Sequence, residues 1–204
     1  MSTINFQKVM SQLAVQRSVF HSEPDLQFAL AWQIKSLYPA ATIYFEKPIQ
    51  INLRKQQTKV EIDLFIVIGG TKIAIEIKYP KAKWRGLVNG EVFDLSATGQ
   101  RDKQLRLYAE DVLRVEHLVN QGFADEGHAI LLTNNALMWQ QAPTNNNQYF
   151  NFVLPQGRTL PRQLVWANDP NSPFTVNLNT TRIVIWQPFS LLQGTSFQYL
   201  VLDA

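Results

Sequence analysis

The chain has 204 residues, no cysteine and a formal net charge of only +3. This length suits one domain, or one domain with an appendage, and a hydrophobic content of 46% is enough to bury a core. The lack of cysteine excludes disulfides, thiolate nucleophiles and zinc–thiolate sites. The sequence has no run of about 18 uncharged apolar residues and no secretory signal pattern at its start, so we expect a cytoplasmic protein without a membrane span.

Positive charge is concentrated in one part of the chain. Residues 54–106 hold 11 Lys and Arg against 6 Asp and Glu, whereas the remaining residues hold 8 basic against 10 acidic. A local excess of this kind suits an anionic partner, although scattered lysines often serve solubility alone.

Two helices are predicted before the first strand. Residues 4–20 show weak helical patterning. The segment 23–37 is predicted as a helix because Ser22 and Asp25 resemble a capping box, Pro24 suits a first turn and apolar residues recur at helical spacing.

Three strands follow and are predicted to form an antiparallel meander. They cover residues 43–53, 59–68 and 71–79, and Gly69-Gly70 turns the chain between the last two. Pro48 indicates an edge position or a bulge in the first strand. Alternation of side chains assigns to one apolar face the residues Val60, Ile62, Leu64, Ile66 and Ile68.

The middle of the chain is predicted to hold a long helix and a buried strand. Residues 80–98 are expected to be irregular, with a turn at Asn89-Gly90. The segment 99–122 is helical by periodicity, and the nearly continuous apolar run 128–135 is typical of a strand buried on both faces. The helix is expected to bury Leu105, Tyr108, Val112, Val115 and Val119 and to expose the ion pairs Asp102/Arg106 and Glu110/Arg114.

The last third of the chain gives a weaker signal. Residues 140–148 form a loop or linker by composition, and short strands are predicted over 151–154, 163–166, 182–187 and 197–202. We therefore expect a single domain over 1–204, with a core at 22–135 and a β-rich C-terminal extension at 136–204.

Ionisable residues interrupt the apolar hairpin around Gly69-Gly70. A two-residue loop fixes the register so that Asp63 lies directly opposite Glu76. The same register sets Glu61 opposite Lys78. Two carboxylates about 5 Å apart repel by roughly 3 kcal/mol at an effective dielectric of about 20.

Two arrangements relieve the repulsion between Asp63 and Glu76. Lys78 neutralises the pair in a purely structural salt bridge, or a divalent ion such as Mg²⁺ binds both carboxylates through oxygen. In the second arrangement Lys78 acts on the attacking water or stabilises developing charge. No zinc motif of histidines, phosphate-binding glycine loop or serine-hydrolase elbow competes with this interpretation.

Asp63, a turn, and Glu76-Ile77-Lys78 on the next strand resemble the motif of the PD-(D/E)xK nuclease superfamily. This family has a restriction-endonuclease-like α/β (α+β) fold, with an αβββαβ core in which helices flank a central mixed sheet. The predicted order of elements matches that core over residues 22–135. A closer likeness is to bacterial members whose helix opens S-E-x-D-x-Q, as at 22–27, and whose strand reads I-A-I-E-I-K-Y, as at 73–79; it implies no activity.

The resemblance implies a Mg²⁺-dependent (or Mn²⁺-dependent) enzyme that hydrolyses phosphodiester bonds of nucleic acid. The implied metal ligands are Asp63, Glu76 and the Ile77 carbonyl. Lys78 is the implied catalytic partner of the attacking water.

Two further residues match positions that many members of this superfamily use for catalysis. Glu23 matches an acid and metal ligand on the first helix, although a carboxylate in a first turn is also favoured by the helix dipole. Gln104 matches a Gln or basic residue on the helix after the third strand, although it also suits a solvated surface. Ile62 stands where the family motif often has proline.

Nucleic acid is the expected partner of this site, DNA above RNA, while homodimerisation is left open. Basic residues and one tryptophan follow the acidic motif and could contact phosphates and stack on bases. The alternative is that these lysines are solvated and that the tryptophan covers the hairpin. The candidate binding residues are Lys81, Lys83, Trp84, Arg85, Arg101 and Lys103.

Three functional interpretations stay open. The first is a restriction-type DNA endonuclease, and the second is a structure-specific endonuclease of repair or recombination. The third is a catalytically inactive relative that binds nucleic acid or protein within a larger bacterial system. The intact set of Asp63, Glu76 and Lys78 favours an enzyme.

Overall fold

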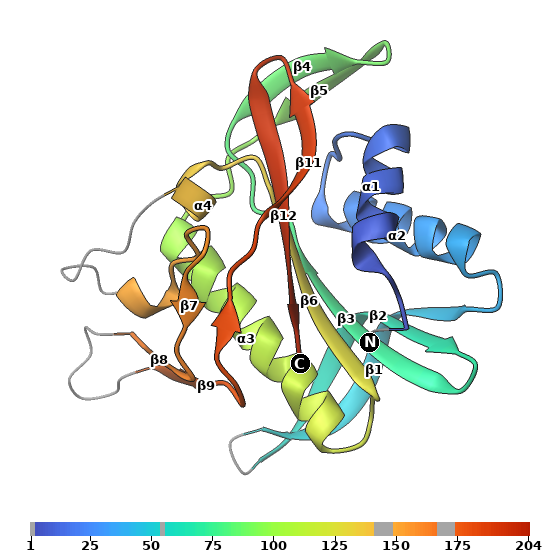
Figure 1. Cartoon of the computed structure of the whole chain (residues 1–204), viewed down its shortest axis with the longest axis vertical. Coiled ribbons are helices and arrows are strands. Elements are labelled where there is room, and N and C mark those ends of the chain that lie inside the picture. Colours follow the sequence, from blue (N-terminus) through green and yellow to red (C-terminus); the bar gives the residue numbers. More distant parts are fainter. Residues whose placement is uncertain (1–2, 54–55, 141–148, 167–173) are drawn as a thin grey trace.

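The computed structural model describes residues 3–53, 56–140, 149–166 and 174–204, with one six-stranded sheet at its centre (Figure 1). The strand order is β1-β2-β3-β6-β12-β11, and within these residues only β3 and β6 are parallel neighbours. The chain is therefore a mixed α/β protein with a central mixed sheet, as predicted at this level. The strands are β1 (Thr42–Leu53), β2 (Gln56–Ile68), β3 (Thr71–Lys78), β6 (Glu126–Thr133), β11 (Gln187–Leu192) and β12 (Thr195–Asp203).

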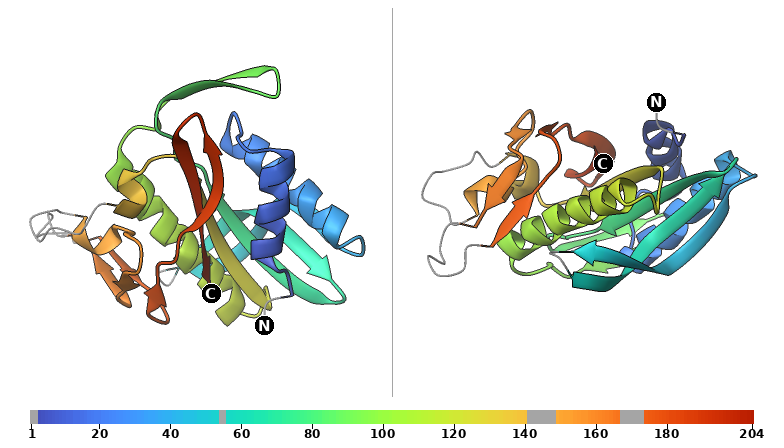
Figure 2. Two further views of the ribbon diagram at one scale, coloured as in Figure 1. Left: turned by 45° about the horizontal axis from the view of Figure 1, so that its top comes forward. Right: turned by 90° about the horizontal axis from the view of Figure 1, so that it is seen from below.

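Helices cover both faces of this sheet (Figure 1 and Figure 2). α1 (Phe6–Gln16) and α2 (Glu23–Leu37) pack on one face, and α3 (Arg101–Asn120) packs on the other. Among the described helices, none is both long and apolar enough to cross a membrane. The first face carries Ile73, Ile75, Ile77, Ile130 and Leu132, and the second carries Ala74, Ala129 and Leu131.

α2 begins where the sequence predicts, directly after Ser22. The Ser22 hydroxyl accepts a hydrogen bond from the backbone N–H of Asp25 at 3.3 Å, which satisfies one donor of the first turn. The Asp25 carboxylate accepts from the backbone N–H of His21 at 3.0 Å and pairs with Arg17 at 2.8 Å. This cap fixes Glu23 at the N-terminus of α2, beside the end of β3.

The turn at Gly69-Gly70 sets the register of the β2–β3 hairpin, as predicted. The ladder extends from the turn as far as Leu64 opposite Ile75. It ends there, one pair short of the expected pairing of Asp63 with Glu76. The prediction that these two acids face each other as a ladder pair is therefore wrong.

β2 reverses the face of its side chains at the point where the ladder ends. Val60 and Ile62 pack on the α3 side, whereas Leu64 packs on the α1–α2 side. The prediction of one continuous apolar face is therefore wrong. Asp63 lies at the reversal. The residue opposite it in β1 is Glu46, but these two are left out of the β1–β2 pairing, and the φ of Glu46 is 47°.

Within residues 80–98 the predicted turn at Asn89-Gly90 is confirmed, but residues 84–95 are not irregular, contrary to the prediction. β4 (Trp84–Val88) and β5 (Glu91–Leu95) form a hairpin around Asn89-Gly90, whose φ angles are 52° and 83°. Two consecutive positive φ angles are typical of a type I′ turn, for which Asn-Gly is a preferred pair. The hairpin projects from one end of the sheet (Figure 1).

The C-terminal part of the chain joins the central sheet instead of standing outside it. β12 pairs with β6 and β11 pairs with β12, so the predicted extension supplies two of the six strands. The strands predicted over 163–166 and 197–202 are confirmed. The strand predicted over 151–154 is wrong, since residues 150–152 form a 3₁₀ helix, and of the strand predicted over 182–187 only residues 182–183 and 187 lie in strands. Residues 141–148 of the predicted linker lie outside the described residues. The short elements are α4 (Leu137–Gln140), η1 (Phe150–Phe152), β7 (Thr159–Leu160), β8 (Gln163–Val165), β9 (Thr175–Asn177) and β10 (Arg182–Ile183).

Candidate active site

Six charged side chains meet where the β2–β3 ladder ends, and we call them the charged cluster. Four of them are residues that the sequence predicts for the site, and two come from α3, which the sequence did not predict. The members are Glu23 of α2, Asp63 of β2, Glu76 and Lys78 of β3, and Asp111 and Arg114 of α3.

Asp63 occupies the fork between the two strands. Its Oδ2 accepts a hydrogen bond from the backbone N–H of Ile77 at 2.7 Å, a donor that the interrupted ladder leaves available. The Asp63 carbonyl accepts from Nε2 of Gln27 at 2.6 Å, and the same nitrogen donates to Glu46 at 2.9 Å. Burial raises the pKa of Asp63, against the opposing effects of the Ile77 N–H and the Lys78 charge.

Lys78 links the two sides of the charged cluster. Its Nζ lies 3.4 Å from Glu23 Oε1 and 3.5 Å from Asp111 Oδ2. Burial acts to lower the pKa of Lys78, but the negative charges of Asp111 and Glu23 outweigh it, so that the pKa is raised. Lys78 is therefore a fixed cation, which suits it to stabilising negative charge and not to accepting a proton.

Glu23 is held at the site, whereas Glu61 is not. Glu23 Oε2 accepts from the backbone N–H of Tyr79 at 2.8 Å while its Oε1 faces Lys78, so the carboxylate is fixed from two directions. Glu61, which the sequence places opposite Lys78, instead pairs with Lys59 at 3.0 Å on the surface. That expected opposition is therefore wrong.

α3 contributes an ion pair that the sequence assigns to the surface. Arg114 Nη1 lies 2.7 Å from Glu76 Oε1 and 3.3 Å from Asp111 Oδ1. The expected pair of Arg114 with Glu110 is wrong, because Glu110 pairs with Arg106 at 3.8 Å. The sequence signal for Asp111 was its position beside the apolar stripe of the helix, since a charge there needs a buried partner.

The charged cluster holds more negative charge than its cations balance. Burial and the charge of Asp111 raise the pKa of Glu76 well above its ordinary value. Burial likewise raises the pKa of Asp111 to about 7, although Lys78 and Arg114 oppose this shift. When all six residues are ionised, four carboxylates face two cations, which leaves a net charge of −2.

The donor chemistry of the cluster fits a hard divalent cation. Its acids offer carboxylate oxygens, the ligands that Mg²⁺ prefers, and Asp111 Oδ2 is buried without a hydrogen-bond partner. The side chains do not form a ready-made metal site: across the described ranges, no three His, Cys, Asp or Glu residues are grouped to hold an ion. Lys78 and Arg114 lie between the carboxylates instead.

Gln104 stands apart from the charged cluster. It lies on α3 seven residues before Asp111, about 10.5 Å along the helix axis. In the part of the chain that the structure describes, no hydrogen bond or ion pair joins Gln104 to the cluster. The α3 residues at the site are instead Asp111 and Arg114. The carbonyl of Ile77, another predicted ligand, accepts a hydrogen bond from Lys78 Nζ at 3.2 Å.

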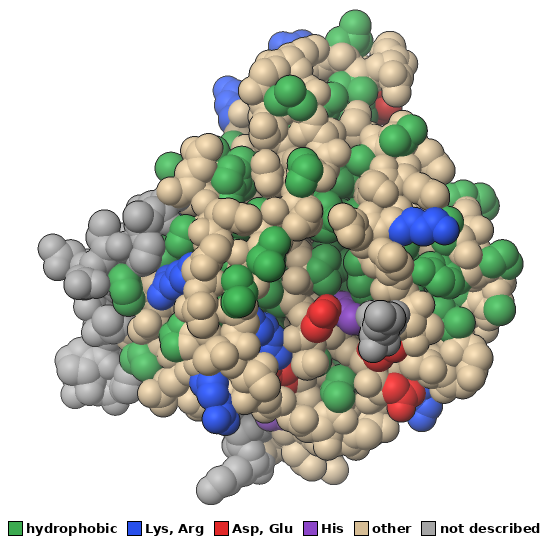
Figure 3. Space-filling model, in the orientation of Figure 1, with side chains coloured by type: hydrophobic (Ala, Val, Ile, Leu, Met, Phe, Trp, Pro, Cys, Tyr) green, Lys and Arg blue, Asp and Glu red, His purple; other side chains and the backbone are tan. Residues whose placement is uncertain are grey.

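Half of the predicted nucleic-acid contacts are engaged within the protein. Trp84 is 8% exposed and packs edge-on against Phe197 with ring centroids 5.7 Å apart, so the prediction that it offers a stacking surface is wrong. Lys81 donates to a backbone carbonyl at 2.8 Å and Arg101 to the Tyr149 hydroxyl at 2.8 Å. On the face shown in Figure 3, Lys and Arg side chains are spread in separate small groups. The exposed members of the predicted set are Lys83, Arg85 and Lys103.

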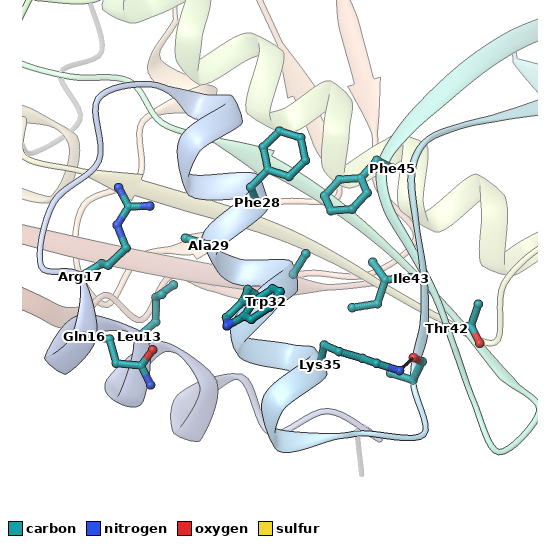
Figure 4. A pocket seen from close by; sticks show the side chains of 12 residues that line it. Leu13, Gln16, Arg17, Phe28, Ala29, Trp32, Lys35, Thr42, Ile43 and Phe45 are labelled. Carbon is teal, nitrogen blue, oxygen red and sulfur yellow. Dashed lines mark hydrogen bonds between the residues drawn. The ribbon is translucent and has the colours of Figure 1, made fainter.

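A groove of about 730 Å³ lies apart from the charged cluster, between α1, α2 and β1 (Figure 4). Trp32 of α2 stands in it with 75% of its surface exposed. Phe28 and Phe45 lie at one end with ring centroids 4.8 Å apart. None of the residues that line the groove belongs to the charged cluster, so it is not part of the candidate active site.

No protein-family model and no curated protein matches this chain. Among solved structures, the crystal structure of SSO0001 is similar, with a TM-score of 0.30 and 13% sequence identity over 86% of this chain. The chain spans 61% of the length of that protein's chain. A likeness at this score carries no argument about family or function, so both are argued from the site.

Proposed function

We propose that this protein is a Mg²⁺- or Mn²⁺-dependent nuclease of the PD-(D/E)xK type, acting on DNA as an endonuclease. One observation carries the proposal: carboxylates from four elements converge where the sheet forks, those of Glu76 and Asp111 are buried, and when ionised the four outnumber the two cations among them. A structural core does not gain from unbalanced buried charge. Metal-dependent hydrolysis of a phosphodiester, in contrast, uses such a group of oxygen ligands.

Each member of the motif has a role that its contacts support. Asp63, Glu76 and Glu23 are the residues that would hold the cation, and the Ile77 N–H orients the Asp63 carboxylate at 2.7 Å. When bound, such a cation activates water and polarises the phosphoryl oxygens. Lys78, kept as a cation by the surrounding acids, stabilises the negative charge that develops on the phosphate.

Nucleic acid is proposed as the substrate in preference to a small phosphate ester. Exposed Lys83 and Arg85 follow the end of β3, and exposed Lys103 begins the helix that supplies Asp111. On a polymer bound at the cluster, such cations contact phosphates distant from the reacting one, which a small ester lacks. The choice of DNA over RNA rests on the resemblance to the superfamily alone.

A non-catalytic binding module of the same type is the second candidate. One observation favours it: Arg114 pairs with Glu76 at 2.7 Å, so this buried acid already has a counter-ion within the chain. In that case the cluster would position helices and strands for a partner, and no cation would be needed.

Cleavage assays decide between the two candidates. Full-length protein is incubated with supercoiled plasmid, branched DNA and RNA in Mg²⁺, Mn²⁺ or EDTA. We expect cleavage with either metal, none in EDTA, and none by Asp63→Ala or Lys78→Ala. Glu61→Ala is the matched control, since it removes an acid of the same strand that pairs with Lys59 on the surface, and it should cleave as the wild type does. No cleavage of any substrate, or cleavage unchanged in both site variants, sinks the nuclease proposal.

A further inference from the structure

We propose that Asp111 is a further carboxylate of the cation site and that Arg114 is its exchangeable counter-ion. In this arrangement a divalent cation and the Arg114 guanidinium compete for oxygens of Glu76 and Asp111, so that one leaves when the other binds. The inference rests on the proposed function, because it concerns the same site. It adds two residues of α3 that the sequence motif does not contain.

Asp111 has the surroundings of a ligand and not those of a surface acid. Its side chain is 4% exposed, and its Oδ2 is buried without a hydrogen-bond partner. A buried acceptor left without a hydrogen bond is unfavourable and rare in native proteins unless it serves a functional role or binds a water or an ion. Oδ2 forms an ion pair at 3.5 Å with Lys78 Nζ, which also lies 3.4 Å from Glu23, so Asp111 and Glu23 share one cation of the site.

Arg114 occupies the place of a shared cation. A single nitrogen, Nη1, lies 2.7 Å from Glu76 Oε1 and 3.3 Å from Asp111 Oδ1, and so bridges a carboxylate of β3 to one of α3. An ion that bound both oxygens would need the same position. The Arg114 side chain is 30% exposed and that of Lys78 is 19% exposed, so the guanidinium is the cation with more access to solvent.

Exchange also improves the charge balance of the cluster. When all four carboxylates are ionised, Arg114 and Lys78 leave the cluster with a net charge of −2. Replacing one guanidinium by a divalent ion reduces this excess by one unit, where burial makes charge imbalance most unfavourable. The released guanidinium remains at the edge of the site, where a phosphate oxygen can accept hydrogen bonds from it.

Isothermal titration calorimetry of the full-length protein with Mg²⁺ and with Mn²⁺ tests this competition. Arg114→Gln should bind either ion about tenfold or more tightly than the wild type, and Asp111→Asn should bind about tenfold or more weakly. Arg106→Gln is the matched control, since it removes an arginine of the same helix that pairs with Glu110 outside the cluster, and it should leave the affinity unchanged. If Arg114→Gln does not fold, Arg114→Lys replaces it, and its looser pairing should shift the affinity in the same direction.

Thermal unfolding gives a readout that a purely structural ion pair would not produce. Arg114→Gln leaves Glu76 buried without its cation, so its Tm in EDTA should fall below that of the wild type. Saturating Mg²⁺ should then raise the Tm of Arg114→Gln by more than it raises the Tm of the wild type. A loss of Tm that Mg²⁺ does not recover would overturn the exchange.

The outcomes separate this inference from the proposed function. If the wild type binds metal and Asp63→Ala does not, but Arg114→Gln and Asp111→Asn both bind as the wild type does, the exchange is refuted and the nuclease proposal stands. If neither the wild type nor any variant binds Mg²⁺ or Mn²⁺, both proposals are overturned.

Discussion

Replacing Asp111 by Asn removes a titrating group from the interface of α3 with the sheet and keeps the shape of the side chain. In the wild type, burial holds the pKa of Asp111 at about 7, against an ordinary value of 3.8. Folding therefore favours the protonated carboxyl. The stability that this proton supplies is complete below a pH near the ordinary value and is lost as the pH rises through about 7. Roughly three pH units at about 1.4 kcal/mol each give a loss of up to about 4 kcal/mol.

Urea unfolding in EDTA between about pH 4 and about pH 8 measures this loss. The Asn side chain does not ionise, so the free energy of unfolding of Asp111→Asn, relative to the wild type, should rise by a few kcal/mol up to about pH 7 and then stay level. The fluorescence of the five tryptophans reports the transition. Glu110→Gln is the control on the adjacent residue of α3, and it should show no such trend because Glu110 pairs with Arg106 outside the cluster.

A free-energy difference between Asp111→Asn and the wild type that stayed constant within about 0.5 kcal/mol over this range would refute the reasoning. It would mean that Asp111 ionises in the folded protein as it does in the unfolded chain. Lys78 and Arg114 would then compensate fully for burial. A trend of the opposite sign would mean that these two cations outweigh burial and lower the pKa of Asp111.

Three further changes test the fold and one predicted binding residue. Ser22→Ala removes the cap of α2 and should lower the free energy of unfolding by about 1 kcal/mol in urea titrations. Arg182→Met leaves Glu116 buried without its cation and should cost about 3–5 kcal/mol by the same measurement, whereas adding Glu116→Leu should recover part of the loss. Trp84→Ala should cost about 3–5 kcal/mol because it leaves a cavity beside Phe197. The folded Trp84→Ala variant should bind single-stranded DNA with the same affinity as the wild type, as measured by fluorescence anisotropy. A loss of affinity without a loss of stability would contradict the structural role of Trp84.

Elements fixed by short-range chemistry could be predicted from the sequence. α2 begins after Ser22 because that hydroxyl caps it, and the hairpin register near Gly69-Gly70 follows because a two-residue turn allows one pairing. Beyond Leu64 the pairing depends on Asp63, whose carboxylate takes the backbone N–H of Ile77. No rule of strand alternation predicts that a side chain accepts a backbone N–H of the neighbouring strand, so the reversal of β2 was missed. The pairing of β12 with β6 was missed because nothing local links two segments so distant in the chain.

The site could be predicted only where it is built from neighbouring strands. The side chains of α3 reach it through the crossover from β3 to β6, whose packing the sequence does not encode in any short pattern. The i,i+4 rule assigned Arg114 to Glu110, but a pair of that kind contributes only about 0.3–0.5 kcal/mol. Leaving Glu76 buried and unpaired would cost about 3–5 kcal/mol. Because the cost of an unpaired Glu76 exceeds the gain from an i,i+4 pair, Arg114 pairs with the buried acid of the sheet.

The two sequence interpretations of the hairpin acids differ in how negative charge is compensated, and the structure narrows that choice. Lys78 pairs with Glu23 and Asp111, while the cation beside Glu76 is Arg114, so no single lysine neutralises the acids of the hairpin. The remaining excess of negative charge in the cluster is compensated either by protons or by a bound cation. Because the pKa of Asp111 is about 7, protons are lost from the cluster as the pH rises through neutrality. The affinity of the cluster for a divalent cation should increase over the same pH range, since a proton and a metal compete for the same carboxylate.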